Sequence, residues 1–327
     1  MGALTTVKAL IAGGLGVIAF LGIARYVFSV DLGRALSYAL QLPPHVFIVA
    51  LALRVATPLI HSAQFYYATR SLGLPLRFSD AMLGVYSSLA MEYAVPVGGA
   101  TEVYRVYFLA RRGLPLSTSI GATFLHRLIH SAVATVELAL VCTYLRTPRY
   151  SGIWLAVATV SVLLLNSLAL AASRSRRLAV TLARVLQRFT PEVVEAGRLH
   201  LESPKYLATS VALVAIEKVV AGSVGLLLTF YFVNPFSLVE SLLLYDLVLA
   251  TFWLLPIVTP AGVGQVEAVQ LAVAVELGLD GASVLPALVL YRATAILAVL
   301  PQLLVALLRS EVQVPRTEKA GAGIHAS

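Results

Sequence analysis

The stretch that decides the fold is PAGVGQVE at residues 260–267, which has a counterpart, PVGGATE, at residues 96–102. Each stretch joins a proline to glycines and ends on a glutamate. Proline interrupts a helix because it lacks a backbone donor, and glycine permits backbone angles that are closed to other residues. Both stretches therefore predict the end of one helix, a sharp reversal and the start of another helix.

The likeness between the two stretches continues along the chain at constant spacing. From each glutamate, 11 residues lead to a Gly-Leu pair, and 14 more lead to an arginine inside an apolar run. Such self-similarity predicts two structural repeats, with a site between them. The first copy holds Glu102, Gly113 and Arg127, and the second holds Glu267, Gly278 and Arg292.

The composition is that of an integral membrane protein. Of the 327 residues, 59% are hydrophobic and only 12% are charged, whereas soluble domains carry about 25% charged residues. A soluble fold would leave several apolar runs of spanning length exposed to water. We expect an all-α polytopic protein of the cell membrane with about eight transmembrane helices, and the apolar runs lie near residues 7–28, 45–68, 79–96, 117–145, 152–172, 206–233, 238–258 and 283–308.

The domain organisation follows from these runs. One transmembrane domain is expected over residues 1–310, with repeat halves near 45–145 and 206–308 and a short disordered tail at 311–327. The stretch 99–112 is too short and too charged to cross the membrane alone. The stretch 262–279 could cross the membrane or re-enter it.

Basic charge gives the orientation. The net charge is +8, and arginines gather in the loop at residues 173–205, which the positive-inside rule places in the cytoplasm. Counting spans back from this loop predicts Arg111 and Arg112 on the same side. The count places Arg70 and Arg77 on the opposite side. In a membrane protein such charge favours anionic lipid headgroups over nucleic acid as partners.

Charged and helix-breaking residues within apolar runs mark the candidate site. An arginine at mid-membrane costs about 2.5 to 3.5 kcal/mol, so Arg127 and Arg292 each need a partner, and Glu102 and Glu267 are the repeat-matched candidates. Helices that restart at the breaks would point free N–H groups at an anion. The candidate headgroup-binding residues are Pro96, Gly98, Gly99, Glu102, Arg105, Arg127, Pro260, Gly262, Gly264, Glu267 and Arg292.

Two alternatives remain open for these residues. The Glu–Arg pairs could touch a ligand, or they could only fasten the broken helices, since structural ion pairs are common. The halves also differ, because Gln270 stands where the first copy has Arg105.

Other polar residues favour helix pairing over chemistry. His61, Glu92 and Glu217 could line a hydrophilic path, although pairing between neighbouring helices is the simpler interpretation. His126 and His130 are four residues apart, but Arg127 follows His126, so the zinc-protease motif is missing. No nucleotide-binding or nucleophile motif is found in the sequence. We therefore expect no catalytic residues, no metal and no cofactor.

The two motif regions resemble those of flippase-like membrane proteins. That family includes the membrane-embedded region of bacterial lysylphosphatidylglycerol synthases and the membrane portion of archaeal glycosyltransferases of the dolichol-phosphate pathway. The resemblance rests on residues 96–102 with Arg105 and Arg127, and on residues 260–267 with Gly278 and Arg292. It implies translocation of a charged or glycosylated lipid. Family members often carry acidic residues where this chain has His126 and His130, and an arginine where it has Val266.

Three functions remain to be compared. The first is binding and translocation of an anionic or glycosylated lipid, which we favour. The second is a non-transporting accessory subunit that presents lipid to a separate lipid-modifying enzyme or glycosyltransferase. The third is an intramembrane enzyme acting on lipid phosphates, for which the sequence offers no recognised constellation of residues.

Overall fold

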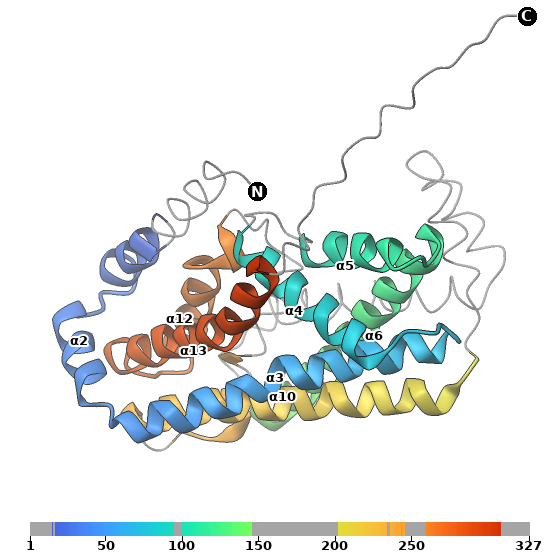
Figure 1. The fold of residues 1–327 in the computed structure, drawn as a ribbon. Coiled ribbons are helices and arrows are strands. Elements are labelled where there is room, and N and C mark those ends of the chain that lie inside the picture. Colours follow the sequence, from blue (N-terminus) through green and yellow to red (C-terminus); the bar gives the residue numbers. More distant parts are fainter. Residues whose placement is uncertain are drawn as a thin grey trace, which may run out of the picture.

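The computed structural model describes residues 15, 17–94, 100–145, 202–233, 236–242, 244–245 and 259–308. Every regular element within these residues is a helix, which confirms the predicted all-α class (Figure 1). The predictions for residues 152–172, for the loop up to residue 201, for the tail 311–327 and for residues 96–99 lie outside the described part.

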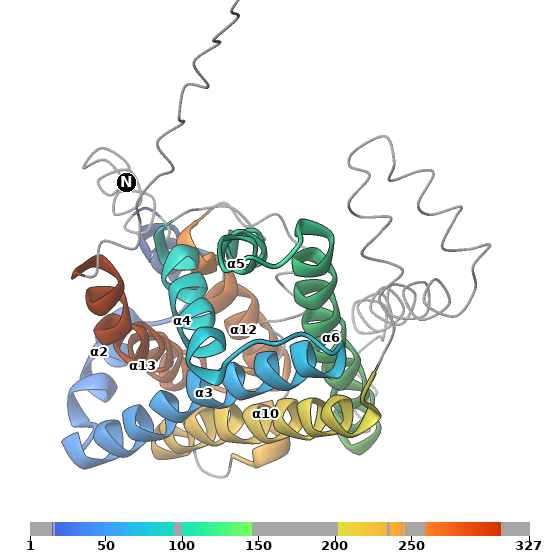
Figure 2. The ribbon, with the colours of Figure 1, turned by 45° about the vertical axis from the view of Figure 1, so that its right-hand side comes forward.

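Long helices form the body of the molecule. α3 and α10 lie side by side along most of their length, as the views in Figures 1 and 2 both show. Three of the described helices contain stretches that are long and apolar enough to cross a membrane, namely 28 residues of α3, 29 of α10 and 20 of α13. The bounds of the long helices are α3 (Pro44–Ser71), α6 (Leu116–Leu145), α10 (Pro204–Phe232) and α13 (Gly281–Leu308).

A short helix, α2 (Leu32–Gln41), precedes this body. It begins at Asp31, whose carboxylate accepts hydrogen bonds from the amides of Gly33 and Arg34 and so caps the helix. α2 packs against α13, and Arg34 pairs with Asp280 at 3.4 Å just before α13 begins.

The first proline-glycine stretch separates two antiparallel helices, α4 (Phe78–Ala94) and α5 (Ala100–Arg111). Near the break, Thr101 Oγ1 donates to Glu92 Oε2 at 3.2 Å. Near the open ends, Arg112 Nη1 lies 2.9 Å from Asp80 Oδ1. Because both ends of the pair are held together, α5 returns to the side on which α4 starts. At 12 residues, α5 is about 18 Å long and too short to cross a hydrocarbon core of about 30 Å.

The second stretch forms a tight turn that leads into α12 (Gln265–Glu276). A single 3-10 turn, η1 (Pro260–Gly262), contains Ala261 at φ 50°, and Gly262 and Gly264 follow at φ 68° and 84°. α12 has 12 residues, which is again too short to span. The length of α12 therefore favours re-entry over a full crossing for residues 262–279.

The internal repeat is present in the structure. α12 starts at residue 265 and α5 at residue 100, a shift of 165 residues. The next two boundaries shift by the same amount, since 276 matches 111 and 281 matches 116. Both short helices end in a Schellman motif. Leu114 N bonds to the carbonyl of Leu109, and Leu279 N bonds to that of Ala274, with Gly113 and Gly278 at φ 88° and 80°.

The two short helices end on opposite sides of the molecule. The end of α5 meets the start of α4, where Arg77 lies. The end of α3 meets the residues before α10, because Ser71 O accepts a hydrogen bond from Glu202 N. The end of α12 lies with α2 and the start of α13 instead (Figure 1). The repeats are therefore inverted with respect to each other.

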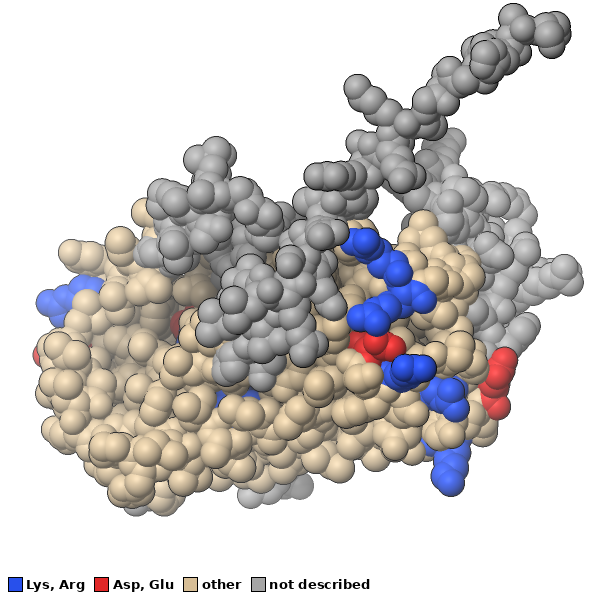
Figure 3. All heavy atoms as spheres, viewed as in Figure 1, with Lys and Arg blue, Asp and Glu red and all other residues tan. Residues whose placement is uncertain are grey.

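This arrangement corrects the predicted topology. Arg70 and Arg77 lie on the same side as Arg111 and Arg112, not opposite them, because α4 and α5 together do not cross the membrane. We call this side the basic end; its residues are Arg70, Arg77, Arg111, Arg112 and Lys205. Figure 3 shows Lys and Arg gathered over this end. The positive-inside rule then predicts that all five residues face the cytoplasm.

Candidate functional site

The predicted Glu–Arg pairs both form, and each joins a short helix to the long helix that follows it. Glu102 on α5 pairs with Arg127 on α6, and Glu267 on α12 pairs with Arg292 on α13. The repeat spacing alone predicted this pairing. Each pair gives a membrane arginine a counter-charge.

The second pair holds the turn at residues 260–264 together. Arg292 Nε donates to Glu267 Oε1, and Arg292 Nη1 donates to the carbonyl of Ala261 at 3.1 Å. The other carboxylate oxygen of Glu267 accepts from the Gly264 amide at 2.7 Å. Glu267 therefore occupies the N-terminus of α12, where an anion would bind, with its own carboxylate. Its side chain is only 6% exposed and that of Arg292 16%.

The first pair is more open. Arg127 Nη1 lies 3.1 Å from Glu102 Oε1, and the two side chains are 31% and 28% exposed. Exposed apolar side chains flank the pair, since Val103 follows Glu102 and Phe124 lies about one turn before Arg127. A polar group next to apolar surface is the environment that a lipid headgroup and its acyl chains require.

Glu92 on α4 lies within electrostatic range of both pairs. Burial and the charge of Glu102 disfavour its ionised carboxylate, whereas Arg292 and Arg127 favour it more weakly. α4 also contacts η1 (Pro260–Gly262). The break after α4 and the turn before α12 therefore meet inside the molecule, and charged residues of both repeats gather there.

Arg105 lies deeper than a direct headgroup ligand would. Its side chain is buried, at 4% exposure, and donates to Ser88 Oγ at 2.9 Å, His126 Nδ1 at 3.1 Å and His61 Nε2 at 2.9 Å. The guanidinium carbon also lies 5.5 Å from the centre of the Phe65 ring. The repeat-matched Gln270 is buried too and donates to the carbonyl of Leu244 at 3.1 Å. Both repeats thus place a buried donor at this position.

The polar contacts continue from Arg105 into a network between α3, α6 and α10. His61 Nδ1 lies 3.2 Å from both carboxylate oxygens of Glu217, so the predicted pairing of neighbouring helices is confirmed here. Gln64 Nε2 donates to Glu217 Oε2 at 2.6 Å, and Gln64 Oε1 lies 2.7 Å from His130 Nε2. We call this group the histidine network: Arg105, His61, His126, His130, Gln64 and Glu217.

The sequence analysis missed three residues of this region. Gln64 lies one turn after His61 on the same face of α3, so helical periodicity could have found it. Ser88 and Tyr291 give no such signal, because only the packing of α4 and α13 against other helices brings Ser88 to Arg105 and the Tyr291 hydroxyl to within 3.0 Å of Arg54 Nη1.

The placement of the remaining candidates is simple. Gly262 and Gly264 lie in the turn beside Glu267, and the backbone of Pro260 opens η1. Pro96, Gly98 and Gly99 fall outside the described residues.

These features define an all-α integral membrane protein in which two inverted repeats bring interrupted helices and paired charges together. The chain belongs to the lysylphosphatidylglycerol synthase transmembrane-region family, whose profile matches residues 6–301. The resemblance seen in the two motif regions is thereby confirmed. No curated protein matches the chain.

Proposed function

We propose that this protein binds an anionic or glycosylated lipid headgroup between its two repeats and moves the lipid between the leaflets of the cell membrane, which the chain crosses several times. The main support is the meeting of two interrupted segments from opposite sides, with Glu92 within electrostatic range of both ion pairs. Irregular backbone at membrane depth is stable only within protein or beside a watery cavity.

The first repeat is the better candidate for headgroup contact. The Glu102–Arg127 pair is partly exposed, at 28% and 31%, whereas the Glu267–Arg292 pair is mostly enclosed, at 6% and 16%. Arg292 is also occupied by the carbonyl of Ala261. In this proposal the second pair fixes the turn, and the first pair opens to exchange its internal carboxylate for the phosphate of a lipid.

Direct exchange explains why both charges are needed. With no lipid bound, Glu102 neutralises Arg127 and lowers the cost of keeping the arginine within the membrane. When a phosphate approaches, it can form bidentate hydrogen bonds with the guanidinium, as a carboxylate can, and so competes with Glu102. Glu102 is then displaced, and the lipid-bound site carries one more negative charge than the empty one.

The neighbouring apolar surface favours a lipid over a free anion. Val103 is 71% and Phe124 57% exposed, and both lie beside the pair on the outer surface of α5 and α6. The acyl chains of the substrate would stay in contact with this surface and the bilayer while the headgroup crosses at the polar residues. We propose no chemical conversion of the lipid, so the protein would act as a carrier and not as an enzyme.

A lipid-scrambling assay tests this function. The protein is reconstituted in liposomes that contain fluorescent phosphatidylglycerol or phosphatidylcholine, and a membrane-impermeant quencher reports movement between leaflets. We expect faster movement of phosphatidylglycerol and a large loss for Arg127→Gln. The matched control is Arg111→Gln, an exposed arginine at the basic end. Movement that is no faster than in protein-free liposomes, for folded protein and every headgroup supplied, would contradict the proposal.

The assay also distinguishes translocation from the alternative function of an accessory subunit. If the isolated protein binds phosphatidylglycerol but never moves it, and a lipid-modifying enzyme co-purifies with it, the accessory-subunit function replaces translocation.

A further inference from the structure

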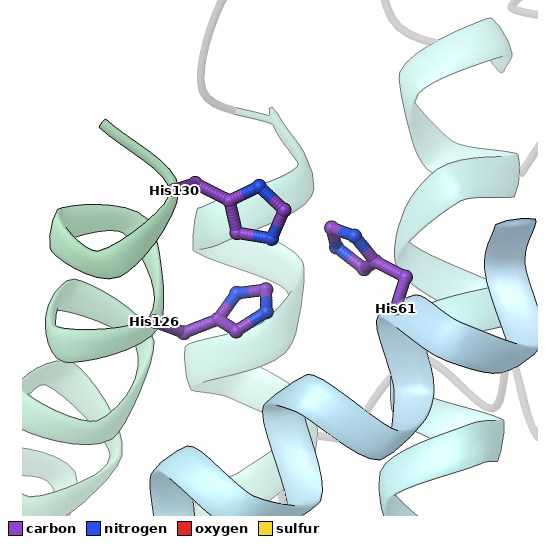
Figure 4. A group of neighbouring side chains, drawn as sticks. All are labelled: His61, His126 and His130. Carbon is purple, nitrogen blue, oxygen red and sulfur yellow. The ribbon is translucent and has the colours of Figure 1, made fainter. Parts of the chain in front are cut away.

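The histidine network contains more titratable groups than the proposed carrier has used so far. Figure 4 shows His126 and His130, one turn apart on α6, facing His61 on α3. The ring centre of His61 lies 4.8 Å from those of both other histidines. Glu217 approaches from α10 and Arg105 from α5. Four helices therefore converge on one small polar cluster.

The hydrogen bonds of the cluster fix the protonation of two of its imidazoles and one nitrogen of the third. Arg105 can only donate, so His126 Nδ1 and His61 Nε2 are acceptors. Neutral His61 then carries its proton on Nδ1 and donates to Glu217. His130 Nε2 donates to the oxygen of Gln64, because the amide nitrogen of Gln64 is already turned to Glu217. His61 and His126 are thus neutral in this arrangement, whereas the bond to Gln64 leaves His130 Nδ1 free to carry either a lone pair or a proton.

Two positions of the cluster are left without partners. His126 Nε2 carries a hydrogen, is buried and has no hydrogen-bond partner within the described part of the chain. When His130 is neutral, its Nδ1 carries a lone pair, and this lone pair receives no hydrogen bond from any described residue. The two rings are 4.7 Å apart. A buried polar atom that is not satisfied requires an explanation, such as water or a bound ion.

A metal ion does not fit this arrangement. The three histidines could each offer one nitrogen, and these atoms lie within 4.8 Å of one another. However, the guanidinium of Arg105 donates into the lone pairs of two of them. A divalent cation would have to displace a buried arginine and would add positive charge next to it. A single proton needs no such displacement.

The charged groups around the cluster also determine whether a proton bound there is stable. Glu217 lies 3.8 Å from His130 Nε2 and would stabilise an imidazolium there. Burial opposes it most, and His61 on α3, Lys218 on α10 and Arg105 on α5 also act against it. Arg127 on α6 acts against a charge on the neighbouring His126. Glu102 on α5 and Glu92 on α4 act on the same site through Arg105. With Arg105 and Glu217 cancelling each other, an added proton leaves an excess positive charge that a nearby anion would neutralise.

We propose that the histidine network is a proton-binding site, with His130 Nδ1 as the atom that takes up the proton, and that its protonation is coupled to binding of the lipid phosphate at Arg127. This inference rests on the proposed function and adds a driving force for the movement of the lipid. The proton comes from water, forms an N–H bond at the free lone pair and is released again when the lipid leaves. Binding of proton and anion then favour each other, as linkage requires.

The two sites are physically connected by adjacent residues. On α5, Glu102 and Arg105 are one turn apart, and on α6, His126 and Arg127 are neighbours. Glu102 bonds to Arg127 at 3.1 Å, and Arg105 bonds to His126 at 3.1 Å. Opening the outer pair therefore changes the spacing of the same two helices at the inner contact.

Proton uptake on lipid binding is the direct test. Purified protein in a weakly buffered detergent solution is titrated with short-chain phosphatidylglycerol while a pH-sensitive dye reports protons and tryptophan fluorescence or calorimetry reports binding. We expect net proton uptake in the wild type and its loss in His130→Gln, which can still donate to Gln64. His45→Gln, at an exposed histidine near the start of α3, is the matched control and should behave as wild type. Glu217→Gln is a second variant, with thermal unfolding used to verify that both fold.

The same preparations in liposomes separate this inference from the proposed function. We expect movement of phosphatidylglycerol to differ by about fivefold or more between the two directions of an imposed pH gradient, and this difference to vanish in His130→Gln. Binding and movement with no proton uptake and no gradient effect would overturn the coupling and leave the carrier intact. Absence of both binding and movement would overturn the carrier and the coupling together. A stoichiometric metal in the purified protein, lost in His130→Gln, would replace the proton site with a metal site.

Discussion

Glu267 binds Arg292 with one carboxylate oxygen and the amide of Gly264 with the other. One side chain thus caps α12, neutralises a membrane arginine and closes the turn that both repeats require. Removing one charge of an enclosed pair leaves the other without compensation. We expect Glu267→Gln to lower the free energy of unfolding by about 3 kcal/mol, measured by denaturant titration in micelles.

A double-mutant cycle tests whether this effect belongs to the pair. Adding Arg292→Gln to Glu267→Gln should cost much less than the sum of the single changes, because the second change removes the uncompensated charge. In the first repeat, Glu102→Gln should cost only about 1 kcal/mol, since that pair is partly exposed. Equal costs in the two repeats would contradict the division into a structural and a ligand-exchanging pair.

A substitution at Arg105 tests whether the shape of its guanidinium matters in addition to its charge. Its guanidinium donates in three directions, to Ser88, His126 and His61. The compact ammonium of a lysine cannot reproduce this planar pattern. Arg105→Lys should therefore lower the unfolding temperature by several degrees and reduce lipid movement, although the charge is kept.

The control for this substitution is Arg111→Lys. Arg111 is exposed at the end of α5 and bonds to Tyr107 within its own helix. We expect no measurable change there, so a similar loss at both positions would show that arginine is needed generally at this surface. Thermal unfolding followed by fluorescence, together with the scrambling assay, gives both results.

Sequence spacing was sufficient to predict the repeat and its ion pairs. The partners Glu102–Arg127 and Glu267–Arg292 lie within 25 residues of each other, and one duplicated pattern placed both. The contact of His61 with Glu217 joins residues 156 positions apart, and no local pattern reports it. It depends on the packing of α3 against α10.

The prediction that Arg70 and Arg77 lie opposite Arg111 and Arg112 was wrong for a related reason. Hydropathy shows that residues 79–96 could span, but it does not show that α5 turns back beside α4. The return is fixed by Asp80 and Arg112, which are 2.9 Å apart in space and separated by a helix break in sequence. Counting residues 79–96 as a membrane crossing therefore placed Arg70 and Arg77 on the side opposite Arg111 and Arg112.

Gly113 and Gly278 allow the repeat itself to be tested. Both end a 12-residue helix at positive φ, and a Cβ atom added at either would meet nothing within 4 Å. The cost of alanine there is therefore backbone strain alone, which is about 1 kcal/mol. We expect Gly113→Ala and Gly278→Ala to destabilise the protein equally and additively in denaturant titrations.

Gly22→Ala provides the matched control for these changes. This glycine lies inside the helical residues 17–26, and a methyl group added there would also meet open space. Alanine should stabilise a helix interior by up to about 1 kcal/mol. The opposite sign at Gly22 distinguishes backbone strain from any general effect of an added methyl group, and unequal costs at Gly113 and Gly278 would argue against equivalent turns.

Cysteine labelling tests the inverted arrangement of the repeats. In a Cys142→Ser background, which removes the single native cysteine, single cysteines at Arg77 and Arg111 should react with a membrane-impermeant maleimide from the cytoplasmic side only. The physical reason is that α4 and α5 form a pair that enters and leaves through the same face, where Arg112 binds Asp80. A cysteine at Asp280, which lies with α2 at the other end, should react only from outside. Right-side-out and inverted vesicles give the two accessibilities directly. Labelling of Arg77→Cys and Arg111→Cys from opposite faces would restore a crossing between them, and the two repeats could then no longer bring their breaks together from opposite sides of the bilayer.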